Sequence, residues 1–395
     1  MPVDLVDPGQ PHAVAADLAA TFASEHGRPP DGVFVAPGRV NLIGEHLDYN
    51  GGRCLPFALP HGTYAAGARR DDDLLTVRSL QVDEPWSGPL GELGPGSLSG
   101  WVAYVGGVVW ALREDGIDVP GLDVVLDSRV PLGSGLSSSA AIECAVAMTA
   151  CTAAGLVWDE DLKERAIAAC MRAENEVAGA ATGGLDQSVA IHARAEHALL
   201  LDFADGSRRD VPWDPEHSGL SLLVIDTRVH HQLNDGGYGD RRSECETAAR
   251  ALGVGRLAEV TDLVDAEERL SDELLLRRTR HVVTENARVA AAVDALDAGD
   301  LTALGPLFEG SHTSLRDDFE VSCEELDVVC AAAVETGALG ARMTGGGFGG
   351  SAIALVPAAR VDAVAAAVTT AFAERGWRPP GILRGRPEAG ARRLR

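Results

Sequence analysis

The amino-acid sequence predicts a mixed fold of helices and strands, of the α/β or α+β class, in two domains. Its 395 residues are more than one hydrophobic core usually serves. Hydrophobic residues make up 46% and charged residues 24%, an ordinary globular balance. Stretches with strand periodicity alternate with stretches of helical periodicity along the chain. We find no internal repeat and no low-complexity tract, which argues against a solenoid or a disordered protein.

Three elements are predicted in the first half of the chain. In residues 122–127, Leu122, Val124 and Leu126 alternate with Asp123, Val125 and Asp127. This is the period of a half-buried strand. Residues 140–154 are rich in strong helix formers and directly follow a serine run, which predicts a helix. Asp159 is expected to cap a further helix that runs to about residue 178, because two acids follow it in the first turn, where the helix dipole favours negative charge.

The polar loop over residues 205–219 contains two prolines and two glycines, and it predicts a domain boundary. We divide the chain there into a first domain of residues 1–213 and a second domain of residues 214–395. A new apolar strand is expected to begin at residues 220–225. The second domain is predicted to hold helices over residues 241–252, 274–296, 323–335 and 361–375, with a strand–loop–strand unit over residues 341–356 among them.

The charge balance limits the possible partners. Thirty-four Lys and Arg residues stand against 59 Asp and Glu residues, a net charge of −25. Such a surface repels nucleic-acid backbones and anionic membranes, so we expect neither as a partner. Lys163 is the only lysine, and genomic base composition is the simplest reason. Because no lysine follows a glycine-rich loop, the chain has no Walker A motif, and neither a protein-kinase signature nor Schiff-base chemistry is plausible.

Seven cysteines are scattered along the chain without a Cys-x-x-Cys pair. This spacing indicates buried thiols in a reducing compartment, not a disulfide framework or a zinc site. The first residues lack the basic and apolar regions of a secretory signal. A cytoplasmic location is therefore expected.

Residues 36–52 (APGRVNLIGEHLDYNGG) hold a Glu, a His and an Asp within four positions, followed by a turn signal. Two carboxylates and an imidazole this close together offer the mixture of donors and acceptors that the hydroxyls of a sugar need. For the charges alone, a solvated loop is the alternative. Only the full pattern of the segment favours the binding site.

Residues 131–141 (PLGSGLSSSAA) lie between the predicted strand and the predicted helix. Glycines allow the backbone to approach an anion, and the start of a helix presents unpaired N–H groups and a positive dipole to it. The serine hydroxyls can reach phosphate oxygens or bind a hard cation such as Mg²⁺. A capped turn without a ligand is the alternative, since a lone Gly-x-Gly before a helix is weak evidence.

Two further segments carry candidate residues. Residues 342–351 (RMTGGGFGGS) contain five glycines in six positions, which indicates either close approach to another group or a tight turn between strands. In residues 180–188 (AATGGLDQS), Asp186 follows a glycine pair that leaves access to it open. Glu174 lies twelve positions upstream on a predicted helix, with Glu176 as the alternative acid by composition. Such residues are more often caps or solvated side chains.

Together these segments resemble the GHMP small-molecule kinases and, within that superfamily, the galactokinases. Residues 38–50 resemble the galactokinase signature, residues 131–141 the GHMP phosphate loop, and residues 342–351 the third GHMP motif, in the expected order. Residues 277–288 (RRTRHVVTENAR) and 311–323 (SHTSLRDDFEVSC) are also family-like. The likeness runs from about residue 35 to residue 356.

The resemblance implies a two-domain GHMP kinase fold of the α+β class. An N-terminal α/β domain like ribosomal protein S5 domain 2 would meet a C-terminal ferredoxin-like α+β domain at the active cleft. It implies MgATP-dependent phosphorylation of the anomeric hydroxyl of α-D-galactose to galactose 1-phosphate and ADP, the first kinase step of galactose metabolism. ATP and Mg²⁺ would be required, galactose and ATP would be the small-molecule partners, and the protein would be a monomer or a weak oligomer.

The resemblance also implies roles for individual residues. Asp186 would be the catalytic carboxylate, with Arg39 as its partner near the transferring phosphoryl group. The galactose-binding positions would be Glu45, His46, Leu47, Asp48, Gly183 and Tyr238. The triphosphate would be held by Gly133, Ser134, Gly135, Leu136, Ser137, Ser138 and Ser139. The Mg²⁺ ligands would be Ser139 and Glu174.

The sequence departs mildly from the family pattern. Leu47 stands where threonine is commoner, and residues 182–185 read Thr-Gly-Gly-Leu in place of Cys-Gly-Ile-Met. Leu185 would reshape the wall beside the anomeric carbon. Two alternatives are a GHMP kinase with another acceptor, such as N-acetylgalactosamine, arabinose or a non-sugar alcohol, and a catalytically silent sugar sensor. The presence of Asp186, Arg39 and the intact serine loop favours an active kinase.

Overall fold

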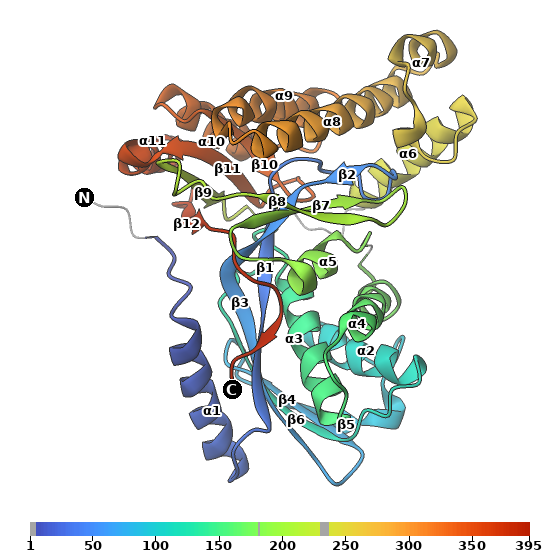
Figure 1. The fold of residues 1–395 in the computed structure, drawn as a ribbon, viewed down its shortest axis with the longest axis vertical. Helices are drawn as coiled ribbons and strands as arrows, with labels where there is room; N and C mark the ends of the chain where they lie inside the picture. Colours follow the sequence, from blue (N-terminus) through green and yellow to red (C-terminus); the bar gives the residue numbers. More distant parts are fainter. Residues whose placement is uncertain (1–4, 181, 230–236) are drawn as a thin grey trace.

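The computed structural model describes residues 5–180, 182–229 and 237–395, and its described elements form two lobes (Figure 1). The first lobe contains a six-stranded sheet in the order β13-β1-β3-β6-β4-β5. All neighbouring strands pair antiparallel except β4 and β6, which are parallel. The strands span Gly32–Asn41 (β1), Pro56–Arg69 (β3), Leu74–Ser79 (β4), Trp86–Pro89 (β5), Leu122–Ser128 (β6) and Arg392–Arg393 (β13).

Helices cover both faces of this sheet (Figure 1). On one face, apolar residues of α2 and α3 pack on alternate positions of β4 and β6. On the opposite face, α1 packs on β1, β3 and the remaining positions of β6. The helices of this lobe are α1 (Pro11–His26), α2 (Trp101–Glu114), α3 (Ser138–Ala153), α4 (Glu160–Arg172), the π-helical turn η2 (Ala173–Ala178) and α5 (Leu185–His192), with a 3₁₀ turn η1 at Leu90–Glu92.

The second lobe places helices on an antiparallel four-stranded sheet in the order β10-β11-β9-β12. Its strands are β9 (Leu220–Asp226), β10 (Gly340–Thr344), β11 (Ser351–Pro357) and β12 (Gly381–Gly385). Its helices are α6 (Gly237–Leu252), α7 (Leu263–Arg269), α8 (Glu273–Asp297), α9 (Leu304–Asp317), α10 (Glu324–Glu335) and α11 (Val361–Glu374), with 3₁₀ turns η4 (Leu257–Glu259), η5 (Leu301–Ala303) and η6 (Ala358–Arg360). A small third sheet of β2 (Arg53–Cys54), β7 (His197–Asp202) and β8 (Arg208–Pro212) lies between the lobes in Figure 1.

The helices and strands predicted from the sequence are present, but the predicted loop over residues 205–219 contains the strand β8. The helix over residues 140–154 is α3, and the helices predicted in the second half are α6, α8, α10 and α11. The strand–loop–strand unit is β10 and β11. Asp159 caps α4 by accepting a hydrogen bond from the Leu162 N–H at 3.0 Å. The continuation to residue 178 changes to the wider π-helical turn η2.

The strand over residues 122–127 is β6, but it is buried on both faces and not on one. The reason is that α1 covers the face that the alternation had predicted to be open, where Val125 packs into the α1 cluster. Asp123 lies on this covered face and is only 3% exposed. Its carboxylate accepts hydrogen bonds from Arg28 at 2.8 Å, from Arg70 at 2.5 Å and from Thr76 at 2.7 Å. These partners replace the water that the predicted half-exposed position would have supplied.

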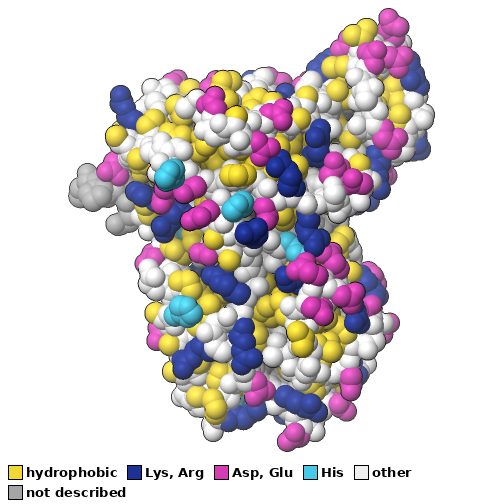
Figure 2. Space-filling view, in the orientation of Figure 1, with side chains coloured by type: hydrophobic (Ala, Val, Ile, Leu, Met, Phe, Trp, Pro, Cys, Tyr) yellow, Lys and Arg dark blue, Asp and Glu magenta, His cyan; other side chains and the backbone are white. Residues whose placement is uncertain are grey.

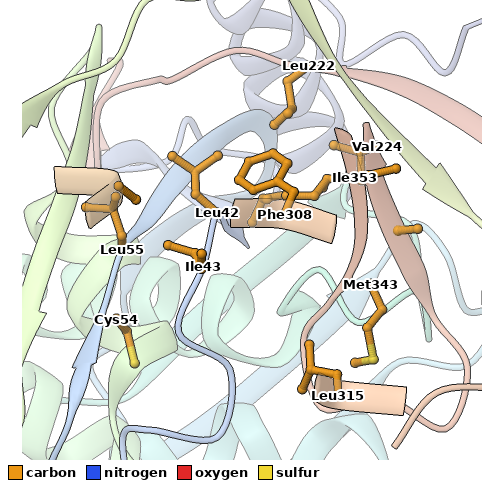
Figure 3. Close-up of a cluster of buried hydrophobic side chains, with 14 of the residues drawn as sticks. Leu42, Ile43, Cys54, Leu55, Leu222, Val224, Phe308, Leu315, Met343 and Ile353 are labelled. Carbon is orange, nitrogen blue, oxygen red and sulfur yellow. The ribbon is translucent and has the colours of Figure 1, made fainter. Parts of the chain in front are cut away.

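The largest hydrophobic core is shared between the two lobes (Figure 3). Leu42, Ile43 and Leu55 from the first half of the chain pack in one cluster with Val224, Phe308 and Ile353 from the second half. The C-terminal strand β13 returns to the first lobe and pairs with β1. The division of the chain at residues 213 and 214 stays a prediction, while the packing joins the lobes into a common interior.

No helix within the described ranges is long and apolar enough to cross a membrane. All seven cysteines are free, and six of them are buried. Acidic side chains are spread over the visible surface, with arginines among them, including the corner formed by α6 and α7 (Figure 2).

Asp123→Asn tests the contribution of the buried carboxylate to stability. Its hydrogen bonds with Arg28, Arg70 and Thr76 outweigh the opposing effect of burial and hold its pKa below the usual value. A folded-state pKa below the unfolded one contributes stability above the unfolded pKa, and that contribution is lost as pH falls through the folded pKa. We therefore expect Asp123→Asn to cost about 1–3 kcal/mol at pH 7 by urea denaturation, with a smaller difference from the wild type below about pH 4.

Asp72→Asn is the matched control, because Asp72 also pairs with Arg70 but is half exposed. It should change stability little. A loss that is the same at pH 7 and pH 3 would contradict the electrostatic origin of the Asp123 contribution.

Candidate active site

A cavity of about 140 Å³ gathers segments that are distant in sequence. It combines the end of β1, the loop that follows β1, the turn before α5, the start of α6 and the turn after β10. The described residues that line it are Arg39, Asn41, Glu45, His46, Asp48, Glu174, Thr182, Gly183, Leu185, Asp186, Tyr238, Gly345 and Gly346. Eight of the residues predicted to be catalytic, sugar-binding or metal-binding therefore meet in one place, together with Leu185.

Asp186 lies in the first turn of α5 and forms a two-point ion pair with Arg39 of β1. The Arg39 Nε donates to Asp186 Oδ1 at 2.7 Å, and Nη2 donates to Oδ2 at 2.9 Å. The Ser137 hydroxyl also donates to Oδ2. The third Arg39 nitrogen, Nη1, donates to the Gly135 carbonyl at 2.6 Å. Arg39 thus fixes the carboxylate against the loop over residues 131–141.

This loop turns sharply before α3. Gly133, Gly135 and Ser137 have φ values of 70°, 73° and 58°, in the left-handed region. Ser137 is the residue before the first turn of α3, and its side chain makes no capping hydrogen bond because it is bonded to Asp186. The first N–H groups of a helix have no partner within the helix. An uncapped helix start preceded by two glycines fits the expected binding of phosphate groups.

The third glycine-rich segment connects β10 to β11, and it also packs against the loop over residues 131–141. The Ser351 hydroxyl donates to the Ser134 carbonyl at 2.7 Å. A Cβ at Gly345 would lie 3.1 Å from the Gly135 carbonyl oxygen, and a Cβ at Gly350 would lie 3.1 Å from that of Ser134. Both alternatives considered from the sequence, a turn between strands and a close approach, therefore apply to this segment.

Ser139 and Glu174 face each other beside this loop. The Ser139 hydroxyl donates to Glu174 Oε1 at 3.0 Å. Burial, with the nearby charge of Asp186, raises the pKa of the Glu174 carboxyl to about 7. A hydroxyl and a carboxylate are the hard oxygen ligands that Mg²⁺ prefers. Glu176 points elsewhere, since it is exposed and paired with Arg172. The structure thus brings Glu174, and not Glu176, to the serine loop.

The segment after β1 supplies the polar wall of the cavity. Burial lowers the pKa of the His46 imidazole to about 3, so the ring is neutral at pH 7. His46 Nδ1 lies 2.9 Å from the Tyr49 hydroxyl, while its Nε2 has no hydrogen-bond partner among the described residues. The buried Asn41 Oδ1 also lacks a partner there. Two buried polar atoms without partners on the lining of one cavity indicate a polar ligand.

Asp48 and Gly183 lie next to each other in the wall of the cavity. Burial raises the pKa of Asp48 to about 6. A Cβ at residue 183 would lie 2.2 Å from Asp48 Oδ2, so only glycine fits there without displacing the carboxylate. Tyr238 completes this side, with its ring centroid 5.4 Å from that of His46. Leu47 is fully buried in the shared core and is not among the described residues that line the cavity.

Arg342, at the start of the third glycine-rich segment, belongs to the site although no role was predicted for it. It is fully buried and donates to the Glu45 carboxylate, to Ser311 Oγ at 3.1 Å and to the Leu42 carbonyl at 2.9 Å. Glu45 also accepts from the Gly345 N–H at 3.1 Å. The guanidinium therefore holds Glu45 of the first lobe against the sheet of the second.

Glu285 supports the same loop from behind. It accepts hydrogen bonds from the Gly44 N–H at 3.0 Å and from Ser311 at 2.6 Å. Burial alone would raise its pKa, but Arg288 and Arg342 lower it to about 2. Glu285 and Ser311 each lie in one of the two family-like stretches, and this was the sequence signal that could have identified them. The structure buries both polar side chains, on α8 and α9.

Comparisons with known proteins agree with this geometry. Residues 103–194 match the family model of the GHMP kinase N-terminal domain, and residues 292–374 match that of the GHMP kinase C-terminal domain. A mevalonate kinase from Methanococcus jannaschii superposes with a TM-score of 0.65 at 16% identity, over 90% of this chain and 98% of that one, which shows a shared fold. The protein is a kinase with the two-domain GHMP kinase fold.

Closer relatives define the family. Residues 20–69 match the galactokinase galactose-binding signature. A galactokinase from Streptomyces coelicolor is 51% identical, over 97% of this chain and 99% of the relative. One from Mycobacterium tuberculosis is 45% identical, over 91% and 98%. The crystal structure of Lactococcus lactis galactokinase complexed with galactose has a TM-score of 0.91 at 31% identity, over 96% of this chain and 99% of that one. The chain belongs to the galactokinase family.

Arg342→Met tests how strongly the buried ion pair holds this site together. The substitution keeps much of the volume but leaves Glu45 buried without its guanidinium. Removal of one partner from a buried ion pair costs about 3–5 kcal/mol, which urea denaturation measures. The double variant with Glu45→Gln should recover part of the loss, because the uncompensated charge is then gone. A loss below about 1 kcal/mol in the single variant would mean that the pair contributes no more than a surface ion pair.

Proposed function

We propose that this protein transfers the γ-phosphoryl group of ATP to the anomeric hydroxyl of α-D-galactose and releases galactose 1-phosphate and ADP. The observation that carries this proposal is the Arg39–Asp186 pair, which joins the phosphate loop to the polar cavity. Membership of the galactokinase family and the similarity to an enzyme crystallised with galactose support the choice of sugar.

The phosphate loop and α3 are proposed to hold the triphosphate. Phosphoryl transfer depends on alignment and on stabilisation of charge over the phosphate oxygens, and needs little covalent help from the protein. Backbone N–H groups at the start of α3 would supply part of that stabilisation, and the guanidinium of Arg39 would supply a fixed positive charge nearby. Ser139 and Glu174 would hold Mg²⁺, which when bound offsets negative charge on the phosphates.

Asp186 is proposed to receive the hydrogen bond of the anomeric hydroxyl and then its proton. Arg39 binds both of its oxygens, so the carboxylate has a fixed orientation toward the sugar. In a loose transition state the nucleophile develops positive charge late, and the proton leaves as the new P–O bond forms. Orientation by Asp186 therefore contributes to the rate together with proton transfer.

Glu45, His46, Asp48, Gly183 and Tyr238 are proposed to bind the sugar. The free Nε2 of His46 and the carboxylate oxygens of Asp48 provide partners for ring hydroxyls, and Gly183 leaves room for Asp48. We also propose that the enzyme works in the cytoplasm, in line with its free thiols, as a monomer or a weak oligomer acting only on small molecules.

A coupled ADP-release assay over a panel of hexoses, pentoses, N-acetylhexosamines and mevalonate tests the proposal. Galactose should give the highest kcat/KM. A purified sample that binds galactose but releases no ADP would indicate a sensor, and preference for another acceptor would indicate a different GHMP kinase.

Asp186→Asn should lower kcat at least about 100-fold, because the amide cannot accept the proton. Steady-state ADP release measures kcat, and a binding assay with an ATP analogue serves as the control for an intact nucleotide site. A near-normal kcat would remove the assignment of Asp186 as the acceptor of the proton.

Asp48→Ala should raise the KM for galactose at least about 10-fold, since a hydrogen bond to a charged group contributes about 1.5–3 kcal/mol. The KM for ATP should stay nearly unchanged, because Asp48 lines the cavity, whereas none of the described residues that line it comes from the phosphate loop. An unchanged galactose KM would contradict the proposed sugar pocket.

A further inference from the structure

The side chain of Gln187 connects two buried carboxyl groups beside the active site. Its Nε2 donates to Glu174 Oε2 at 2.7 Å and to Glu143 Oε2 at 3.0 Å. Its Oε1 accepts a hydrogen bond from Thr182 at 3.4 Å. Gln187 and Glu143 are both fully buried. Because each N–H of the amide serves one carboxyl group, the orientation of the Gln187 side chain is fixed.

These contacts close a network through three helical elements. Glu143 lies four positions after Ser139 on α3, so the two side chains share one face of that helix. Glu174 lies on η2, and Gln187 directly follows Asp186 on α5. The hydrogen bonds run from Ser139 to Glu174, from Gln187 to Glu174 and from Gln187 to Glu143. The network therefore ties the helix of the phosphate loop to the helix that carries Asp186.

Stability alone does not account for this arrangement. Two buried carboxyl groups around one amide carry a large desolvation cost, and Glu143 Oε1 has no hydrogen-bond partner among the described residues. Replacement of a whole buried ionic cluster by apolar side chains of similar volume is often neutral or stabilising. Neither Gln187 nor Glu143 is among the described residues lining the cavity, so direct contact with the sugar does not account for them either.

We propose that Gln187 is a positioning residue for the metal ion and that Glu143 is its anchor. Gln187 holds Oε2 of Glu174, which keeps Oε1 beside the Ser139 hydroxyl, where the two oxygens form a pair of ligands. Glu143 holds the second N–H of Gln187 and so prevents the amide from rotating. This inference rests on the proposed role of Glu174 as a Mg²⁺ ligand, and it extends that role to two residues without contact to the ion.

Gln187→Met tests the proposal, because methionine has a similar volume and no N–H donors. The measurement is Mn²⁺ binding by electron paramagnetic resonance in the presence of a non-hydrolysable ATP analogue, which reports on the metal without turnover. We expect Mn²⁺ affinity to fall at least about 10-fold, as for other groups that orient metal ligands. The dissociation constant for galactose should stay within about twofold. The urea midpoint should fall, because two buried carboxyl groups lose their donor, so galactose binding serves as the control for an intact fold.

Glu143 provides a second, independent pair of variants. Glu143→Gln keeps an oxygen that accepts from Gln187, so its Mn²⁺ affinity should stay near that of the wild type. Glu143→Met removes the acceptor and should weaken Mn²⁺ binding in the same direction as Gln187→Met. If Gln187→Met does not fold, this pair decides the question, and equal affinities in the two Glu143 variants would overturn the proposal.

Two variants of η2 separate this inference from the proposed function. Glu174→Gln should weaken Mn²⁺ binding, while Glu176→Gln, on the same turn but exposed and paired with Arg172, should not. If Glu174→Gln weakens binding and Gln187→Met does not, the positioning role is wrong and the proposed function stands. If Glu174→Gln leaves binding unchanged, the metal assignment fails and the inference fails with it.

Discussion

The two-point ion pair between Arg39 and Asp186 organises the site, because it fixes three segments of the chain at once. Arg39 lies at the irregular part of β1, where the pairing register with β3 shifts between Pro37 and Arg39. A Cβ at the intervening Gly38 would lie 2.6 Å from the Leu136 carbonyl oxygen, so glycine is what allows β1 to approach the phosphate loop this closely. From there the guanidinium reaches both α5 and the Gly135 carbonyl. Neither a lysine nor a Walker A loop is part of this arrangement.

Charge neutralisation around Glu45 follows a different principle. Around Asp186 the partners are partly open to the cavity, whereas Glu45, Glu285 and Arg342 are enclosed. A buried charge needs a partner of opposite sign and further hydrogen bonds. Arg342 meets this need with backbone carbonyls of the first lobe and Ser311 of the second. The loop that carries Glu45 is thus held from behind by side chains, in addition to the hydrogen bonds of its own turns.

The sequence predicted those parts of the molecule whose signals are local. Helix formers after a serine run identified α3, Asp159 identified the start of α4, and the glycine-rich segments identified the surroundings of Asp186. Signals that depend on tertiary contacts were missed. The alternation in β6 could not reveal that α1 covers its second face, and the choice between Glu174 and Glu176 required the geometry of η2. The contacts of Arg342, Glu285 and Gln187 join segments far apart in the chain. Spacing does not reveal such contacts, even where a family-like stretch marks the residue, as it does for Glu285.

The pairing of β13 with β1 has a consequence for the exposure of the first sheet. β1 carries Arg39, and part of its outer edge is covered by residues 392 and 393. Without this cover, the N–H and C=O groups of that edge would be open to pairing with a strand of another molecule. A two-residue strand thus shields the sheet that carries Arg39 from edge-to-edge association.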